Sequence, residues 1–170
     1  MSKTLILFRH AKSDWDSDNG TDHDRPLATR GVKAAAAMGK FLAEVGHLPE
    51  LAISSTALRA MTTLKLAKEA GNWPCETRLD KSLYNTDPSA VMRYIAALPS
   101  DVQSVMLVGH ETTWSELTAL LTGGGNVRFP TGAMVRMDFA AETWASVQPN
   151  SGELVWFVPP RFVTEGQLKL

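Results

Sequence analysis

Two arginines and two histidines follow short apolar runs at three separate places in the chain. Arg9 and His10 come directly after the first run, Arg59 lies shortly after the second, and His110 follows the third after one glycine. Guanidinium groups bind the oxygens of phosphates and carboxylates, and a neutral imidazole can act as a nucleophile. These residue types together favour the binding and transfer of an anionic group.

A phosphoryl group suits this set of side chains. It carries roughly −1.5 to −2 charges near neutral pH, which two planar guanidinium groups can neutralise. Arg59 would lie near the start of a helix, where free backbone N–H groups and the helix dipole also favour an anion. His10 can accept the phosphoryl group and later release it to water, and His110 can donate to its oxygens in the transition state.

The elements that must position these side chains are short apolar runs and intervening segments of helical spacing. The runs suit strands buried on both faces. They are Leu5–Phe8, Leu51–Ser54, Val105–Val108, Met134–Phe139 and Leu154–Val158. The predicted helices follow Thr29–Gly31 and close at Gly46, run from about Ser55 to Gly71, open at Pro88, and run from about Thr113 to Thr122. The first should bury Val32, Ala35, Ala36, Gly39, Leu42 and Ala43.

Strands that alternate with helices predict an α/β fold, a three-layer α/β/α sandwich with a mainly parallel central sheet. The last two strands, separated by Pro149–Gly152, predict an antiparallel C-terminal edge. In such sheets ligands bind beyond the carboxyl ends of the strands. We therefore expect the two arginines and two histidines to converge there, within a single domain over residues 1–170.

Composition and charge disfavour several function classes. Of the 170 residues, 44% are hydrophobic and 21% are charged, as in ordinary globular proteins. The net charge of −1 gives no basic field that would recruit nucleic acid or an anionic membrane. Cys75 is the only cysteine, which excludes an internal disulfide and fits a reducing compartment. The apolar runs are too short for a signal peptide or a membrane span of about 18 residues, so we expect a soluble, cytoplasmic protein.

Three segments around the arginines and histidines carry a family resemblance. They are Arg9-His10-Ala11-Lys12-Ser13, Ser54-Ser55-x-x-x-Arg59-Ala60-x-x-Thr63 and Val108-Gly109-His110-Glu111. They resemble the signature blocks of the histidine phosphatase superfamily, which includes the cofactor-dependent phosphoglycerate mutases. The chain is most similar to the small SixA-type phosphohistidine phosphatases. That likeness spans nearly the whole chain and includes Asp22-His23-Asp24-Arg25-Pro26-Leu27-x-x-Arg30-Gly31 and Leu154-Val155-Trp156-Phe157-Val158-Pro159.

The resemblance implies a role for each of the four side chains. His10 would be the phosphate acceptor, and Arg9, Arg59 and His110 would bind the transferred phosphoryl group. The family's phosphoglycerate mutase-like fold agrees with the sandwich predicted from the strand and helix pattern. No cofactor and no metal are expected.

Other polar residues near these segments have two interpretations each. Lys12, beside the nucleophile, either contacts the substrate or is solvated; we expect contact, and the same of Ser13. Arg25 either extends the positive rim of the pocket or orients its loop by pairing with nearby aspartates. His23 and His47 lack such a context and are interpreted as surface or turn residues, although His23 has a rim role toward the substrate as an alternative.

The sequence differs from that of the mutase branch at two places, one of which bears on protonation of the leaving group. In that branch Gly-Glu stands where this chain has Ala11-Lys12, and a downstream glutamate protonates the leaving alkoxide. The comparable stretch, residues 79–85, has no glutamate, so the general acid is unidentified, with Asp14, Asp16 and Asp80 as candidates. An imidazole released from phosphohistidine can depart neutral if its distal nitrogen is already protonated. A preference for phosphohistidine or other phosphoramidates is therefore our hypothesis.

Three functions stay open at this point. The first is a phosphatase that hydrolyses phosphohistidine in proteins, or related phosphoramidates, through a phosphohistidine intermediate. The second is a small-molecule phosphomonoesterase of the same chemistry, acting on a sugar or nucleotide phosphate. The third is a noncatalytic phosphate-binding module. It is disfavoured because the two arginines and two histidines, including the nucleophile His10, are all present. The partner would be a phosphorylated protein or metabolite, and a monomer is the default because no heptad pattern suggests obligate assembly.

Overall fold

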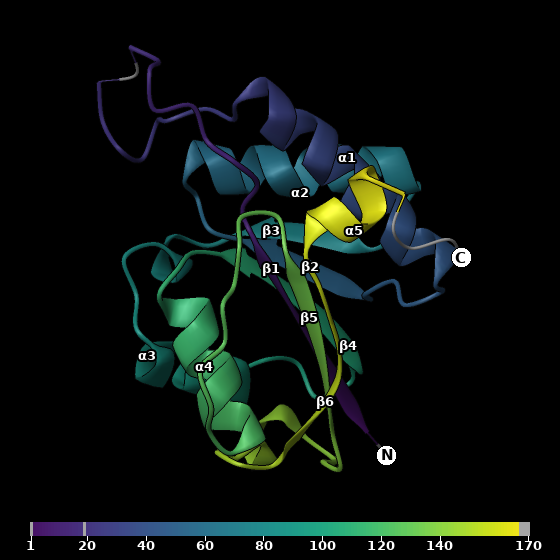
Figure 1. The fold of residues 1–170 in the computed structure, drawn as a ribbon. Helices are drawn as coiled ribbons and strands as arrows, with labels where there is room; N and C mark the ends of the chain where they lie inside the picture. Colours follow the sequence, from purple (N-terminus) through teal and green to yellow (C-terminus); the bar gives the residue numbers. More distant parts are fainter. Residues whose placement is uncertain (1, 19, 167–170) are drawn as a thin grey trace.

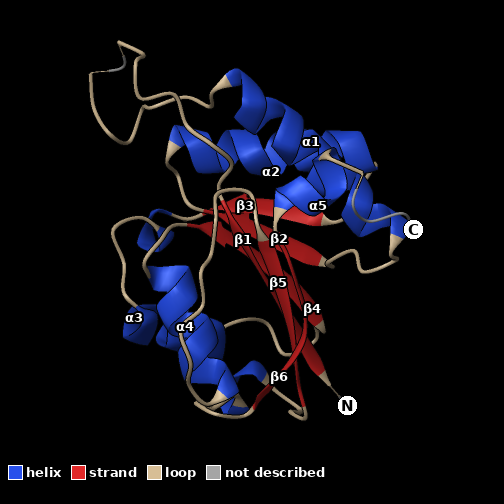
Figure 2. Cartoon of the chain, viewed as in Figure 1, coloured by secondary structure: helices blue, strands red, loops and turns tan. Residues whose placement is uncertain are grey.

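The computed structural model describes residues 2–18 and 20–166. A six-stranded sheet lies between two layers of helices (Figures 1 and 2). Its order is β3-β2-β4-β1-β5-β6, in which β3, β2, β4 and β1 run parallel, and β5 and β6 are added by antiparallel pairing. The strands are β1 (Lys3–Arg9), β2 (Leu51–Ser54), β3 (Glu76–Leu79), β4 (Ser104–Gly109), β5 (Met134–Phe139) and β6 (Gly152–Val158). The predicted three-layer sandwich with an antiparallel C-terminal edge is confirmed.

Helices cover both faces of the sheet (Figure 1). One layer holds α1 (Thr29–Glu44), α2 (Leu58–Gly71) and α5 (Pro160–Thr164), and the other holds α3 (Pro88–Ala96) and α4 (Thr113–Thr122). Two short 3₁₀ turns, η1 (Lys81–Leu83) and η2 (Trp144–Ser146), complete the described elements.

The core is divided by the central strand β1, because successive side chains of a strand point to opposite faces. Ile6 and Phe8 are fully buried in a cluster that includes residues of α1 and α2. Leu5 and Leu7 are fully buried in a second cluster with residues of α3 and α4. The continuous apolar run thus reflects burial on both sides.

Local signals account for the helix ends on the α3–α4 side. The Asp87 side chain accepts a hydrogen bond from the backbone N–H of Ala90 at 3.0 Å, directly before Pro88 at the first helical position. Helix α4 ends at Gly123, which adopts a left-handed conformation with φ 91°. The predicted bounds of α4, Thr113–Thr122, are confirmed.

Several elements differ from the sequence analysis: α2 begins at Leu58 rather than near Ser55, and α5 was not predicted. Strand β3 was not predicted, because all four of its residues are exposed and it pairs only with β2 at the edge of the sheet. The buried face of α1 was predicted to include Val32, which is 39% exposed, whereas Met38 and Phe41 are buried. A Cβ at Gly39 would lie 2.0 Å from the carbonyl oxygen of Ala67, so α1 meets α2 at this glycine.

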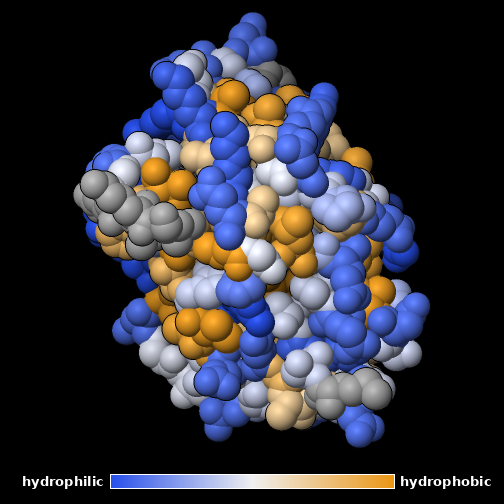
Figure 3. All heavy atoms as spheres, turned by 90° about the vertical axis from the view of Figure 1, so that its right-hand side faces the viewer, coloured by the Kyte–Doolittle hydropathy of each residue, from blue (hydrophilic) through white to orange (hydrophobic). Residues whose placement is uncertain are grey.

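Exposed apolar side chains are spread over several elements and include Leu79 of β3 and Leu154 and Val155 of β6. On the face that Figure 3 shows, apolar side chains form separate patches between polar ones. Among residues 2–18 and 20–166, no helix has the length and apolar character needed to cross a bilayer.

Candidate active site

The sheet register brings the ends of β1, β2 and β4 together. Arg9 pairs with Gly109, and Ser54 pairs with Val108. Beyond the strands, the backbone N–H of His10 donates to the carbonyl of Gly109 at 3.0 Å. Residues that follow these three strands are therefore held within one small region.

The four side chains singled out in the sequence line one pocket of about 230 Å³. The rings of His10 and His110 have centroids 5.2 Å apart. The Arg59 Nη2 lies 3.5 Å from the His110 Nδ1, and Arg9 lines the same hollow. His10 and Arg59 are only 7% and 5% exposed, so the pocket presents buried imidazole and guanidinium groups.

Gly109 allows the indole of Trp114 to lie against the end of β4 beneath the pocket. A Cβ at this position would lie 2.5 Å from the indole of Trp114. That indole donates from Nε1 to the carbonyl of Phe8 at 3.0 Å. Trp114 of α4 thus contacts the ends of both β4 and β1, close to His110 and His10.

The tautomer of His10 is fixed by the backbone carbonyl of the next residue, Ala11. Its Nδ1 lies 2.7 Å from the carbonyl oxygen of Ala11, which can only accept, so Nδ1 carries the hydrogen. Burial lowers the pKa of His10 to about 3; the Ala11 bond opposes the shift, and His110 and the charges of Arg59 and Arg9 add to it. Near neutral pH the ring is uncharged and its Nε2 has a free lone pair.

The second histidine is held from both sides. His110 Nε2 lies 2.9 Å from the hydroxyl of Ser55, while Arg59 lies at its Nδ1. Burial, followed by the charge of Arg59, lowers the pKa of His110 to about 4. His110 is therefore also neutral near pH 7, with a ring orientation set by two neighbours.

Asp22 joins two arginines at the pocket wall. Arg59 donates to the Asp22 carbonyl at 2.6 Å and to its Oδ2 at 3.0 Å, and Arg25 pairs with Oδ1 at 2.8 Å. The Tyr84 hydroxyl donates to Oδ2 at 2.9 Å. Partial burial favours the neutral acid, but the Tyr84 bond and the charges of Arg59 and Arg25 lower the pKa of Asp22 on balance. The sequence analysis did not single out Asp22 or Tyr84.

The arginines retain donors beyond these bonds. Arg9 donates from Nη1 to the carbonyl of Phe129 at 2.6 Å. Within the described part of the chain, the buried Nε atoms of Arg9, Arg25 and Arg59 have no hydrogen-bond partner. A guanidinium has five N–H donors, so these side chains can serve structural acceptors and an anion together.

Lys12, Ser13 and Arg25, the additional residues expected to contact the substrate, also line the pocket. Both interpretations of Arg25 apply, since its guanidinium pairs with Asp22 and also forms part of the pocket wall. Its guanidinium stacks 3.4 Å from the ring centroid of Trp15, which is 69% exposed at the rim. His23 is outside the lining residues, and its Nε2 lies 3.0 Å from the Thr56 hydroxyl.

The pocket also includes Glu111 and Thr131, which the sequence analysis did not identify as site residues. The three candidate acids, Asp14, Asp16 and Asp80, are not among the lining residues. Asp80 instead accepts hydrogen bonds from Ser82 and Tyr94. The position of Glu111 beside His110 in the third signature segment was the one available signal.

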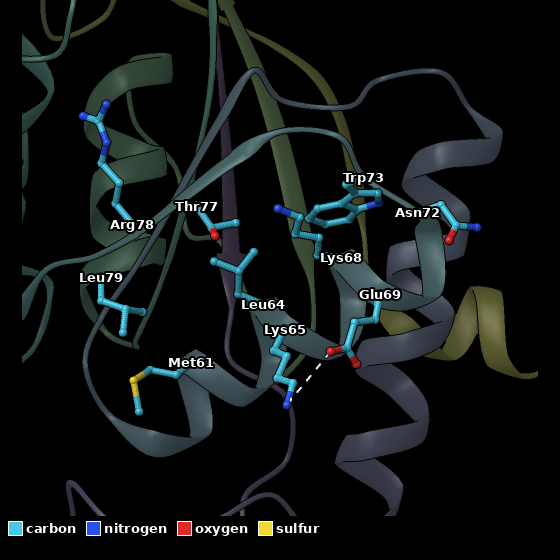
Figure 4. A pocket seen from close by; sticks show the side chains of 10 residues that line it. All are labelled: Met61, Leu64, Lys65, Lys68, Glu69, Asn72, Trp73, Thr77, Arg78 and Leu79. Carbon is cyan, nitrogen blue, oxygen red and sulfur yellow. Dashed lines mark ion pairs between the residues drawn. The ribbon is translucent and has the colours of Figure 1, made fainter.

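A larger hollow of about 580 Å³ lies between α2 and β3, away from the histidines (Figure 4). Its wall includes Leu64, Trp73 and Leu79, together with an ion pair between Lys65 and Glu69 at 4.0 Å. It contains no histidine or cysteine among its lining residues, so the chemistry expected from the sequence lies in the smaller pocket.

Comparisons with known proteins agree with this geometry. A family model described as histidine phosphatase superfamily (branch 1) matches residues 5–87. An uncharacterized protein of Mycobacterium leprae is 34% identical over 166 residues, covering 91% of this chain and 100% of that protein. A candidate phosphohistidine phosphatase SixA from Nakamurella multipartitia has a TM-score of 0.78 and 28% identity, covering 94% of this chain and 97% of its own.

A solved structure of the protein histidine phosphatase SixA complexed with tungstate has a TM-score of 0.79 and 26% identity. The match covers 92% of this chain and 97% of that one. The fold and these relatives place the chain among phosphatase-type enzymes that act on phosphorylated substrates. It belongs to the histidine phosphatase superfamily, in the SixA-type branch, as the resemblance in its sequence predicted.

Proposed function

We propose that this protein is a metal-independent phosphatase that hydrolyses phosphohistidine in proteins through a phosphohistidine intermediate on His10. The observation that carries the proposal is the bond from His10 Nδ1 to the carbonyl of Ala11. It leaves Nε2 as the nucleophile, and burial keeps the ring neutral until it reacts.

In the first step, His10 Nε2 attacks phosphorus while the bond from phosphorus to the leaving group breaks. Arg9, Arg59 and His110 surround the phosphoryl oxygens and stabilise the charge that develops on them. The phosphorylated ring of His10 carries both the N–P bond and the Nδ1 proton, so it is cationic, and the Ala11 carbonyl stabilises that charge.

In the second step, water attacks phosphorus and the bond to His10 Nε2 breaks. The electron pair returns to Nε2, and the neutral imidazole departs with its Nδ1 proton in place. Inorganic phosphate is released, and the enzyme returns to its starting state. The same carbonyl that orients the nucleophile therefore makes it a good leaving group.

The surroundings of the pocket support a protein substrate. The pocket of about 230 Å³ shares Trp15 and Arg25 with a neighbouring surface hollow of about 400 Å³. The pocket suits a phosphorylated side chain, and the neighbouring hollow offers a surface for its parent protein at a rim that includes Trp15. The SixA relative that binds tungstate, a tetrahedral oxyanion, is consistent with phosphoryl binding here.

Metal independence is proposed from the arginines of the pocket. Arg9 and Arg59 can meet the charge of the phosphoryl group, since guanidinium groups neutralise an oxyanion without a metal. A single domain, a monomeric state and a cytoplasmic location remain proposals from the sequence.

The test is a phosphatase assay with a histidine-phosphorylated protein and, in parallel, a sugar phosphate, each with a chelator present. We expect turnover of the phosphoprotein to survive the chelator and to exceed that of the sugar phosphate. His10→Ala should abolish it, whereas His47→Ala, which alters a histidine beside Trp156 rather than in the pocket, should not. Loss of activity with chelator, or activity in His10→Ala, would overturn the proposal.

A further inference from the structure

Glu111 is the carboxylate among the residues that line the pocket. It follows His110 directly and precedes α4. Its Oε1 accepts a hydrogen bond from the backbone N–H of Ser115 at 2.9 Å. In the described part of the chain no hydrogen bond engages its Oε2. One carboxylate oxygen is therefore anchored and the other is available to a molecule in the pocket.

Other nearby carboxylates are committed elsewhere. Asp22 is bound by two arginines and Tyr84, which favour its charged form and leave it no proton to give. Asp80 accepts bonds from Ser82 and Tyr94.

We propose that Glu111 is the general acid of this pocket, required for phosphoryl transfer to His10 from phosphate esters and dispensable for transfer from phosphohistidine. The inference rests on the proposed function, because it assumes attack by His10. A phosphate ester releases an oxygen that needs a proton, whereas an imidazole leaves neutral when its distal nitrogen is protonated. A requirement for Glu111 would thus distinguish phosphate esters from phosphohistidine, the two substrate classes that the sequence left open.

Glu111 gives up its proton in the first step and regains one in the second. As His10 Nε2 forms its bond to phosphorus, the ester P–O bond breaks and the Glu111 proton moves to the departing oxygen. The alcohol leaves, and Glu111 is a carboxylate. When water attacks the phosphorylated ring, that carboxylate takes one proton from the water. Phosphate is released, His10 is free, and Glu111 has regained its proton.

Charged and titratable groups surround Glu111 in the pocket. They are Arg9, Lys12, Arg25, Arg59, His10 and His110. The charge of Glu111 opposes the lowering of the Arg9 pKa that burial causes, so these two side chains interact electrostatically. The two histidines are neutral near pH 7, and the negative phosphoryl group of a bound substrate offsets the arginines.

A purely structural role is the competing interpretation, because the bond to Ser115 also satisfies a free amide at the start of α4. Glu111→Gln separates the two roles. The amide oxygen of glutamine can keep the bond to the Ser115 N–H, but glutamine cannot donate an acidic proton. Glu116→Gln is the matched control, because Glu116 is an exposed residue of the same helix and is not a lining residue.

The experiment compares kcat/KM of wild type and both variants on phenyl phosphate, 4-nitrophenyl phosphate and a histidine-phosphorylated peptide. 4-Nitrophenolate is the more stable leaving group and needs less protonation than phenolate. General acid catalysis contributes about 10²- to 10⁴-fold. We expect Glu111→Gln to lose at least about 100-fold on phenyl phosphate, much less on 4-nitrophenyl phosphate, and least on the phosphohistidine peptide. Glu116→Gln should match wild type.

Equal losses of Glu111→Gln on all three substrates would show a structural or binding role and overturn the inference. No loss on phenyl phosphate would overturn it as well. Either result would leave the proposed function standing, provided that the wild type turns over the phosphohistidine peptide. A wild type inactive on all three substrates would instead overturn the proposed function and the inference with it.

Discussion

Acidification should destabilise the protein through His10 itself. The pKa of this buried imidazole is about 3 in the folded chain, lowered from 6.5. Between these values the unfolded chain binds a proton that the folded chain does not, so the free energy of unfolding falls as the pH falls below 6.5. About pH 4.5 lies about two pH units below 6.5. At 1.36 kcal/mol per unit, the free energy of unfolding is lower there by roughly 3 kcal/mol.

Urea unfolding of wild type and His10→Gln at about pH 7 and about pH 4.5 measures this contribution. Glutamine does not titrate, and the ionisable groups distant from His10 are common to both proteins and largely cancel in the comparison. His110 lies beside His10 and is coupled to it, so the difference reports the histidine pair. We expect the wild type to lose about 3 kcal/mol more than the variant over this interval. The same loss in both proteins would refute a neutral, buried nucleophile.

Three further substitutions test the supports of the pocket. Asp22→Asn should lower kcat/KM on phosphorylated substrates about 10-fold, because it weakens the charged hydrogen bond that holds Arg59. A kcat/KM within twofold of wild type in steady-state assays would contradict this role of Asp22. Gly109→Ala should lower the free energy of unfolding by about 1–3 kcal/mol, because the added Cβ would lie 2.5 Å from the Trp114 ring. An unchanged denaturation midpoint would contradict this close packing. Trp15→Ala should raise KM for a phosphorylated protein several-fold and leave 4-nitrophenyl phosphate hydrolysis unchanged. The reason is that the exposed ring lies at the rim of the pocket. Equal effects on both substrates would contradict a role of Trp15 in docking the protein.

Most of the sheet could be predicted from the sequence, because strands buried on both faces produce continuous apolar runs. Strand β3 was the exception. Its sequence, Glu76 to Leu79, is exposed throughout and is held only by pairing with β2. Backbone pairing at a sheet edge leaves no apolar pattern that could distinguish such a segment from a loop.

The buried face of α1 was predicted only in part for a related reason. Helical spacing gives the period of a face but does not say where its centre lies. Contact at Gly39 with α2, together with burial of Met38 and Phe41, leaves Val32 outside the core. That packing depends on a neighbour distant in the sequence.

The convergence of the four candidate site residues could be predicted from the sequence because each lies at or shortly after the end of a strand, and parallel strands end at one edge. The supporting residues could not. Asp22 and Tyr84 reach the site from loops, whose paths have no periodic signal. Glu111 was visible in the third signature segment, but only the pocket geometry distinguishes it from Asp14 and Asp80 as a candidate acid.

The central claim is that His10 Nε2 carries the phosphoryl group during turnover. Rapid alkaline quenching after mixing with a histidine-phosphorylated protein, followed by mass spectrometry of the enzyme's peptides, tests it most directly. The account predicts one transient phosphoryl group on His10, absent from His10→Ala. Phosphorylation of another residue such as Ser55, or full turnover with no label on His10, would contradict it.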